Sequence, residues 1–320
     1  MMYFSRLIIL VIFLWSNAFD ANPQADTFRD PVRQQAALKI ASDGIALLKN
    51  KDDLLPLDIT RLKILAVIGE SAIRQQAPGD GSSEIKALYE ITPLQGLIDK
   101  VADSANVVYA KSYSDHVTQG MIERAVDVAK IADVAIIFTG LSHRKFSDAE
   151  GTDRLDIKLP FRQDEMITAV TNVNPNTIVV NISGSPVEMP WVDQVPAIVQ
   201  AWYSGMEAGT AIAQVLFGDV NPSGKLPFTF PIDLEDSPAH AMGNYPGNDS
   251  LVIYEEGIYV GYRYYEKHDI DVLFPFGHGL SYTTFEYRDL TLENSKDDEN
   301  IAVAKVVIKN SGDRAGAEIV

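Results

Sequence analysis

Residues 133–140 read DVAIIFTG, and this unbroken apolar stretch, which ends in a glycine, decides the fold. Apolar residues at every position, rather than at every second one, predict a β-strand that is buried on both faces. Similar runs occur at residues 63–69, 106–110, 177–183 and 197–203. Between the runs, apolar residues recur with helical spacing at residues 118–132, 162–173 and 207–217. Alternating strands and helices predict an α/β fold, a parallel-sheet α/β/α sandwich.

The pattern changes after about residue 231. Residues 233–271 are rich in Tyr, Gly and Pro and have no clear period. From residue 282, apolar and polar residues alternate, first as YTTFEYRDLTLE and then, from residue 301, as IAVAKVVIKN. Such alternation predicts the opening strands of an antiparallel β-sandwich. Two or three strands cannot close a sandwich, so we expect this second unit to be incomplete.

The first residues are typical of an export signal. One cation in residues 1–6 is followed by the apolar run LIILVIFLW at 7–15 and by the small residues at 16–18. The run is well short of the roughly 20 residues that span a bilayer. The pattern predicts a signal peptide at 1–18, a polar linker at 19–35, and a secreted or periplasmic protein with no other membrane association. An uncleaved anchor or a wrongly assigned start is the alternative.

Composition excludes several classes of function. The formal net charge of −17 argues against a nucleic-acid partner, since phosphate binding requires clustered cations. The sequence has no cysteine, which rules out disulfides and a thiolate nucleophile, and its five histidines are scattered. The stretch GDVNPSGKL at 218–226 has one residue too many between its glycines for a phosphate-binding loop. We therefore expect no metal and no cofactor.

One loop carries residues suited to catalysis. The strand at 133–140 is followed by LSHRKFSDAEGTDRLDIKLP, and ligands bind at the carboxyl ends of parallel strands. The loop is either a solvated charged segment or the support of a catalytic carboxylic acid. Gly151 permits a backbone angle that would aim Glu150 outward. A protonated Glu150 could then donate to a leaving-group oxygen, as in glycoside hydrolysis.

The sequence also resembles the C-terminal part of a family 3 glycoside hydrolase of the β-glucosidase type. Six motifs occur in the order found in that family: IALLKN…LLPL at 45–57, GDGSS at 79–83, AEGTDR…LP at 149–160, VLFGDVNPSGKLPFTFP at 215–231, YEEGIYVGYRYYE at 254–266 and LFPFGHGLSYTTFEY at 273–287. The resemblance implies that residues 36–280 form the α/β sandwich domain of the family. It implies that residues 281–320 begin a fibronectin type III-like domain.

The resemblance assigns a role to Glu150. In the EG-x-DR motif of the family the glutamate is the general acid/base, and the implied mechanism is double displacement with retained configuration. The two carboxyl groups then lie about 5–5.5 Å apart. Asp153 and Arg154 complete the motif, and we interpret them as a charged pair that fixes the Glu150 loop.

Other residues are weaker candidates for substrate contact. The GGSS-like turn of the family lies near the sugar-binding rim, so Ser82 and Ser83 are candidates, with a plain polar turn as the alternative. His143 could face the site or be an ordinary loop histidine. Trp191 and Trp202 could stack on sugars, but they lie in or beside apolar runs, which favours core packing. Five tyrosines either form a surface that binds sugars or belong to a long segment that wraps over the domain with some tyrosines packed and others exposed: Tyr254, Tyr259, Tyr262, Tyr264 and Tyr265.

Family members carry a catalytic barrel ahead of the sandwich, and its aspartate is the nucleophile. Such a barrel needs roughly 250 residues, so we expect it to come from elsewhere, for example a separate gene. We expect the chain alone to have negligible activity on a β-linked oligosaccharide or glycoside and to expose an apolar patch where the barrel packs. The alternatives are a non-catalytic carbohydrate-binding or interaction module, or an inactive gene fragment.

Overall fold

The computed structural model describes residues 30–114, 117–143, 147–247, 251–294 and 302–320. The expected signal peptide and the linker up to residue 29 lie outside these ranges. The last residues of the expected linker form the start of helix α2 (Pro31–Gly44). The Asp30 carboxylate accepts the Val32 N–H at 2.9 Å, and proline suits the first helical turn. Among the described helices, none combines the length and apolar character needed to cross a bilayer.

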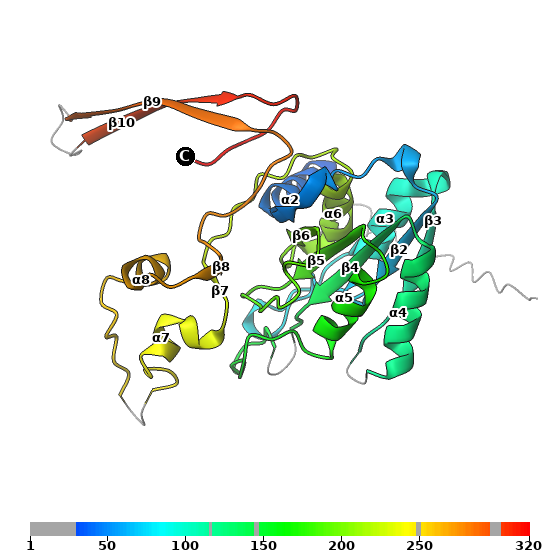
Figure 1. The fold of residues 1–320 in the computed structure, drawn as a ribbon, viewed down its shortest axis with the longest axis horizontal. Helices are drawn as coiled ribbons and strands as arrows, with labels where there is room; N and C mark the ends of the chain where they lie inside the picture. Colours follow the sequence, from blue (N-terminus) through cyan, green and yellow to red (C-terminus); the bar gives the residue numbers. More distant parts are fainter. Residues whose placement is uncertain (1–29, 115–116, 144–146, 248–250, 295–301) are drawn as a thin grey trace, which may run out of the picture.

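A six-stranded sheet forms the centre of the main domain, in the order β1-β6-β5-β4-β2-β3 (Figure 1). Strands β2 to β6 are parallel, which confirms the predicted α/β sandwich. The edge strand β1 pairs antiparallel with β6 and was not predicted. The bounds are β1 Ala46–Asn50, β2 Ile64–Ile68, β3 Asn106–Ala110, β4 Val134–Gly140, β5 Thr177–Ile182 and β6 Ala197–Gln200.

Helices cover both faces of this sheet. The predicted helices are confirmed to within two residues as α4 (Gln119–Ile131), α5 (Gln163–Thr171) and α6 (Ala208–Leu216), whereas α2 and α3 (Pro93–Val101) were not predicted. Apolar residues of α2, α3 and α6 share one buried cluster with the sheet, and those of α4 and α5 share the other. The two clusters make the α/β/α layers.

Short 3-10 turns punctuate the loops. They are η1 Lys51–Asp53, η2 Ile59–Arg61, η3 Glu70–Ala72, η4 Gly81–Ser83, η5 Ala102–Ser104, η6 Gly205–Glu207 and η7 Leu234–Asp236. The Tyr-, Gly- and Pro-rich region holds α7 (Pro238–Ala241) and α8 (Tyr262–His268). A small antiparallel pair flanks it, β7 (Phe230–Pro231) with β8 (Val272–Phe274). This segment runs outside the main layers (Figure 1).

Later parts of the chain bind the outer edge of β1. The Leu280 N–H donates to Leu47 O at 2.7 Å, and the Gly224 N–H donates to Ile45 O at 3.2 Å. A ring nitrogen of His278 lies 2.8 Å from the carbonyl oxygen of Leu48. These contacts cover an edge strand that would otherwise leave its backbone groups unpaired.

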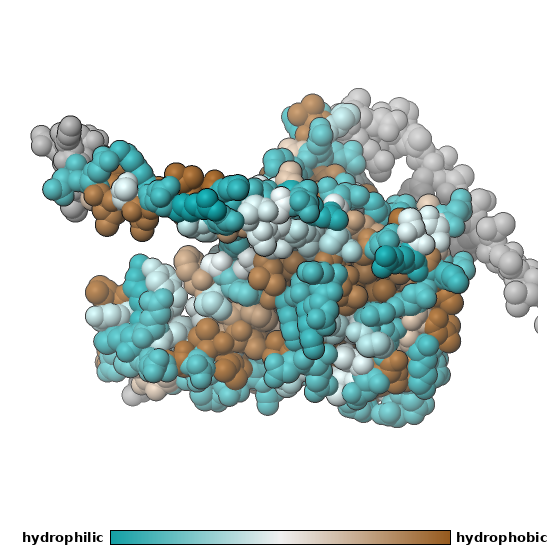
Figure 2. Space-filling model, turned by 45° about the horizontal axis from the view of Figure 1, so that its top comes forward, coloured by the Kyte–Doolittle hydropathy of each residue, from teal (hydrophilic) through white to brown (hydrophobic). Residues whose placement is uncertain are grey.

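The predicted period-two region forms the hairpin β9 (Phe285–Asn294) and β10 (Ala302–Asn310). The hairpin projects from the sandwich, and Figure 2 shows brown and teal side chains close together along it. Residues after β10 return to the main domain, where Glu318 pairs with Lys225 at 3.0 Å. Several apolar side chains of the hairpin are exposed, namely Tyr287, Leu290, Leu292, Val303 and Val307.

Candidate active site

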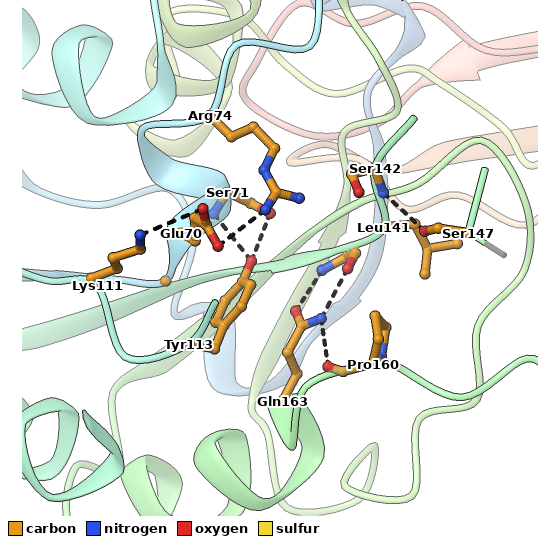
Figure 3. Close-up of polar contacts among 12 residues, drawn as sticks. Glu70, Ser71, Arg74, Lys111, Tyr113, Leu141, Ser142, Ser147, Pro160 and Gln163 are labelled. Atoms are coloured by element: carbon orange, nitrogen blue, oxygen red, sulfur yellow. Dashed lines mark hydrogen bonds and ion pairs between the residues drawn. The ribbon is translucent and has the colours of Figure 1, made fainter. Parts of the chain in front are cut away.

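Gln163 fixes both ends of the loop that follows β4. Its side chain is fully buried, accepts the Gly140 N–H at 2.9 Å, and donates to the carbonyl oxygens of Gly140 and Pro160, each at 2.9 Å (Figure 3). The Thr139 hydroxyl also donates to it at 2.6 Å. The loop therefore begins and ends on one buried amide, although about twenty residues separate its ends.

A second buried group joins the ends of β2 and β4. The Tyr113 hydroxyl donates to Phe138 O at 3.1 Å. It accepts the Ser71 N–H at 3.1 Å (Figure 3). Burial raises the pKa of Tyr113 to about 12, so the phenol stays protonated. Beside it, Glu70 pairs with Arg74 at 3.0 Å and with Lys111 at 3.6 Å. The carboxyl ends of these two strands are thus fixed relative to each other.

Asp148 ties three loops together, although sequence reasoning did not single it out as a site residue. Its Oδ2 accepts the Gly184 N–H at 2.7 Å and the Tyr203 hydroxyl at 2.8 Å, and its Oδ1 accepts the Ser185 hydroxyl at 2.5 Å. Burial, and then the Asp148 charge, raise the pKa of Tyr203, which keeps its hydroxyl a donor. The loops after β4, β5 and β6 therefore meet on one carboxylate.

Asp153 and Arg154 hold the Glu150 loop, but to two different segments. Arg154 donates to the Ser185 hydroxyl at 2.9 Å and to Pro186 O at 2.7 Å. Asp153 accepts a hydrogen bond from the hydroxyl of Tyr245, on the segment after α7. The expected charged pair is therefore corrected to two separate anchors.

Glu150 stands exposed on this loop and meets the GDGSS turn. The Ser82 N–H donates to Glu150 Oε2, and this bond, together with the Ser82 side chain, lowers the pKa of Glu150. A Cβ on Gly81 would overlap the Glu150 carboxylate, so the close approach depends on glycine. Two motifs that lie 68 residues apart in the chain thus form one site.

The other candidate residues lie close by. The Ser83 hydroxyl donates to Asp80 O at 2.7 Å, within its own turn. The His143 ring lies against the Tyr203 ring, with centroids 4.2 Å apart, and its Nδ1 is 3.2 Å from Asp148 O. Ser82 is therefore the candidate that contacts Glu150, whereas the His143 ring packs against Tyr203.

An open hollow of about 520 Å³ lies along the loop that carries Glu150, although Glu150 itself does not line it. Its walls come from the loops after β4 and β5: Ser147, Asp148, Ala149, Thr152, Asp153, Arg154, Ile157, Gly184, Ser185 and Pro186. Carboxylates, hydroxyls and a guanidinium here offer both acceptors and donors, which suits a ligand rich in hydroxyl groups. Within the described residues, no three His, Asp or Glu side chains gather as they would around a metal ion.

The model of the glycosyl hydrolase family 3 C-terminal domain matches residues 45–262. The chain belongs to glycoside hydrolase family 3. It is 43% identical to β-glucosidase BoGH3A of Bacteroides ovatus in an alignment that covers 89% of this chain and 41% of that protein. It is 40% identical to thermostable β-glucosidase B of Acetivibrio thermocellus, over 98% of this chain and 41% of that protein. The chain thus spans about two fifths of the length of these relatives.

Solved structures of β-glucosidases share the fold. DesR of Streptomyces venezuelae, solved with D-glucose, superposes with a TM-score of 0.82 at 28% identity, covering 90% of this chain and 50% of that one. The family 3 β-glucosidase of Bifidobacterium adolescentis gives 0.78 at 36% identity, covering 88% and 41%. The predicted family and fold are confirmed.

The aromatic residues of this family 3 domain divide between core and surface. Trp191 is 1% exposed and its Nε1–H donates to Asp164 at 2.7 Å, which confirms the expected core packing. Trp202 is half-buried and donates to Gly44 O at 2.9 Å. Among the five tyrosines, Tyr264 and Tyr265 are buried whereas Tyr254 is 79% exposed. The tyrosines therefore do not form a single exposed platform.

Proposed function

We propose that this chain supplies the general acid/base, Glu150, and part of the sugar site of a retaining β-glucosidase-like glycoside hydrolase. The substrate would be a β-linked oligosaccharide or glycoside, and the reaction would belong to carbohydrate metabolism. One observation carries the proposal: Glu150 is an exposed carboxyl group that contacts Ser82 of the GDGSS turn, on a loop whose two ends are fixed by Gln163.

The mechanism needs a second carboxylate, which we assign to the barrel aspartate of the family, whether encoded in the same longer chain or separately. That aspartate attacks the anomeric carbon while Glu150 donates its proton to the departing glycosidic oxygen. Glu150 then removes a proton from water, which hydrolyses the glycosyl–enzyme bond. The two carboxyl groups need a separation of about 5–5.5 Å.

The protonation state of Glu150 follows from its neighbours. The Ser82 N–H stabilises the carboxylate and lowers the pKa of Glu150. A second carboxylate nearby would raise that pKa, because two like charges disfavour each other. The acid form needed for the first step therefore depends on the barrel as well as on this domain. For the chain without a barrel we expect no detectable turnover of an aryl β-glucoside.

The test compares Glu150→Gln with the unchanged protein in a preparation that contains a matching barrel. Loss of a general acid should slow cleavage of a nitrophenyl β-glucoside about 10²–10⁴-fold. Cleavage of a dinitrophenyl glucoside, whose leaving group needs no proton, should keep its fast first step, and added azide should restore turnover by replacing water. Glu84→Gln, an exposed change on the neighbouring loop, is the control. Unchanged activity in Glu150→Gln would refute the proposal.

We also propose that the mature protein is secreted or periplasmic, because residues 1–18 have the composition of a signal peptide. Amino-terminal sequencing of the exported protein tests this. A start near residue 19 supports the proposal, and an intact Met1 in the cell interior opposes it.

A further inference from the structure

The loop from residue 76 to residue 90 is closed at its base by one carboxylate. Glu90 accepts the N–H of Gln76 at 2.8 Å and the N–H of Ala77 at 2.9 Å. Further out, the Ile85 N–H donates to Pro78 O at 2.8 Å. A carboxylate that accepts two backbone N–H groups makes strong, directional bonds. The two ends of this loop are therefore held at a fixed distance from each other.

The base of the loop is attached to the sheet end that leads to Glu150. The Gln76 side chain is buried and donates to Leu141 O at 3.2 Å. Leu141 directly follows β4, so it is the first residue of the Glu150 loop. On the other side, the Ile91 N–H donates to Met206 O at 2.9 Å. Glu90 thus lies between two attachments of its loop to the sandwich.

The tip of the same loop contacts Glu150. The turn Gly81–Ser83 presents the Ser82 N–H to Glu150 Oε2, and Gly81 leaves room for the carboxylate. Because a hydrogen bond weakens steeply with poor distance or angle, a small rotation at the base of the loop would break the contact at its tip.

We propose that Glu90 is a positioning residue, whose carboxylate clasps the base of the 76–90 loop and so holds the Ser82 N–H on Glu150. The catalytic meaning of this clasp rests on the proposed function, but the positioning itself can be measured without catalysis.

Two effects of the change Glu90→Gln on Glu150 have opposite signs. Removing a negative charge would lower the pKa of Glu150, because a nearby anion disfavours a second one. Releasing the clasp would raise it, because the Ser82 N–H and hydroxyl are what stabilise the Glu150 carboxylate. A glutamine offers one acceptor oxygen in place of two, so it can satisfy only one of the two N–H groups well.

The experiment is an NMR titration of the whole chain labelled with carbon-13 at its glutamate carboxyl groups. The Glu150 signal is assigned by its loss in Glu150→Gln. In Glu90→Gln we expect the Glu150 midpoint to rise. Glu84→Gln removes the same charge from an exposed position on the same loop. In that variant the Glu150 midpoint should stay or fall. If the Glu150 midpoint also stays or falls in Glu90→Gln, the proposal is overturned.

A second variant covers the case in which Glu90→Gln fails to fold. Gly81→Ala places a methyl group against the Glu150 carboxylate without changing any charge. It should raise the Glu150 midpoint, and an unchanged midpoint would show that the tip contact does not control this group, contrary to the proposal.

The proposed function has its own readout. In a preparation with a barrel, Glu90→Gln should shift the alkaline limb of the pH–rate profile upward, since Glu150 would keep its proton to higher pH. If Glu90→Gln raises the NMR midpoint of Glu150 but leaves the alkaline limb where it was, the clasp is supported and Glu150 is rejected as the acid. The clasp alone would be rejected by a different pair of results. Glu150→Gln would lose the alkaline limb, while Glu90→Gln would move neither that limb nor the NMR midpoint of Glu150.

Discussion

The hydroxyl of Tyr203 donates to Oδ2 of Asp148 at 2.8 Å, at the carboxyl ends of three parallel strands. This bond connects the segment after β6 to the loop that carries Glu150. The Tyr203 ring also lies against His143, on the same loop. The position of the proposed acid/base therefore depends on a side chain 53 residues further along the chain.

Tyr203→Phe removes one donor from Asp148 and keeps the ring. Hydrogen bonds to charged groups contribute about 1.5–3 kcal/mol, so we expect the free energy of unfolding to fall by that amount. Urea unfolding followed by circular dichroism measures it. Tyr287→Phe, which removes an exposed hydroxyl on the hairpin, should change stability by less than about 0.5 kcal/mol. Equal effects of the two changes would contradict this account of Asp148.

Gln163→Leu should be more damaging, because it leaves the buried N–H and C=O of Gly140 without the partner they now have. Each unpaired buried backbone group costs about 1–3 kcal/mol, so we expect a loss of about 3–5 kcal/mol in urea unfolding. Gln35→Leu alters an exposed glutamine on α2 and should have little effect. A stable Gln163→Leu protein would mean that the loop ends are held by other contacts.

Asp164 gives a prediction about pH. Burial raises the pKa of Asp164 although the Trp191 N–H opposes this. Its pKa in the folded state is therefore above the unfolded value, and the wild-type chain loses stability as pH rises from the unfolded value through the folded one. Asparagine keeps an acceptor for Trp191 without a charge, so Asp164→Asn should gain Tm relative to wild type at pH 7 but not at pH 4.

The control for this prediction is Asp127→Asn on the exposed face of α4, whose carboxylate is only loosely paired with Lys130 at 3.7 Å. Its Tm difference from wild type should be small at both pH values. A gain in Asp164→Asn that is equal at pH 4 and pH 7 would show that burial of the charge is not the cause.

Residues 251–260, between α7 and α8, carry an exposed apolar stretch. The exposed side chains are Leu251, Val252, Ile253, Tyr254, Ile258, Tyr259 and Val260. Large exposed apolar patches favour association, so we expect concentration-dependent association in sedimentation velocity. The double change Ile258→Ser and Val260→Ser should reduce it, whereas Val32→Ser, an isolated exposed valine on α2, should not. A monodisperse monomer at high concentration would contradict the prediction.

The sequence was most informative where strands are buried on both faces. The apolar run at 133–140 becomes β4 with all seven residues buried, because a strand between two helical layers leaves no polar face. Strand β1 escaped prediction because its direction is set by pairing with β6, in which Gln200 lies opposite Ala46, and short apolar runs do not reveal their partners.

The site was partly predictable for the same kind of reason. A family motif located Glu150, and a second motif located Ser82, but their contact depends on how two loops fold over one sheet edge. Asp148 lies two residues before Glu150 in a strongly charged loop, so its role as an anchor could not be separated from that of a solvated carboxylate. Tyr203 lies at the end of a predicted strand run, which gave no sign of its partner.

The edge of β1 has a consequence for synthesis. Leu47 is made well before the groups that cover its strand, which belong to residues 224, 278 and 280. On the ribosome, this edge must wait for more than two hundred further residues before it can be closed. Until then the nascent chain exposes a strand edge with unpaired backbone groups, which is the kind of surface that chaperones protect.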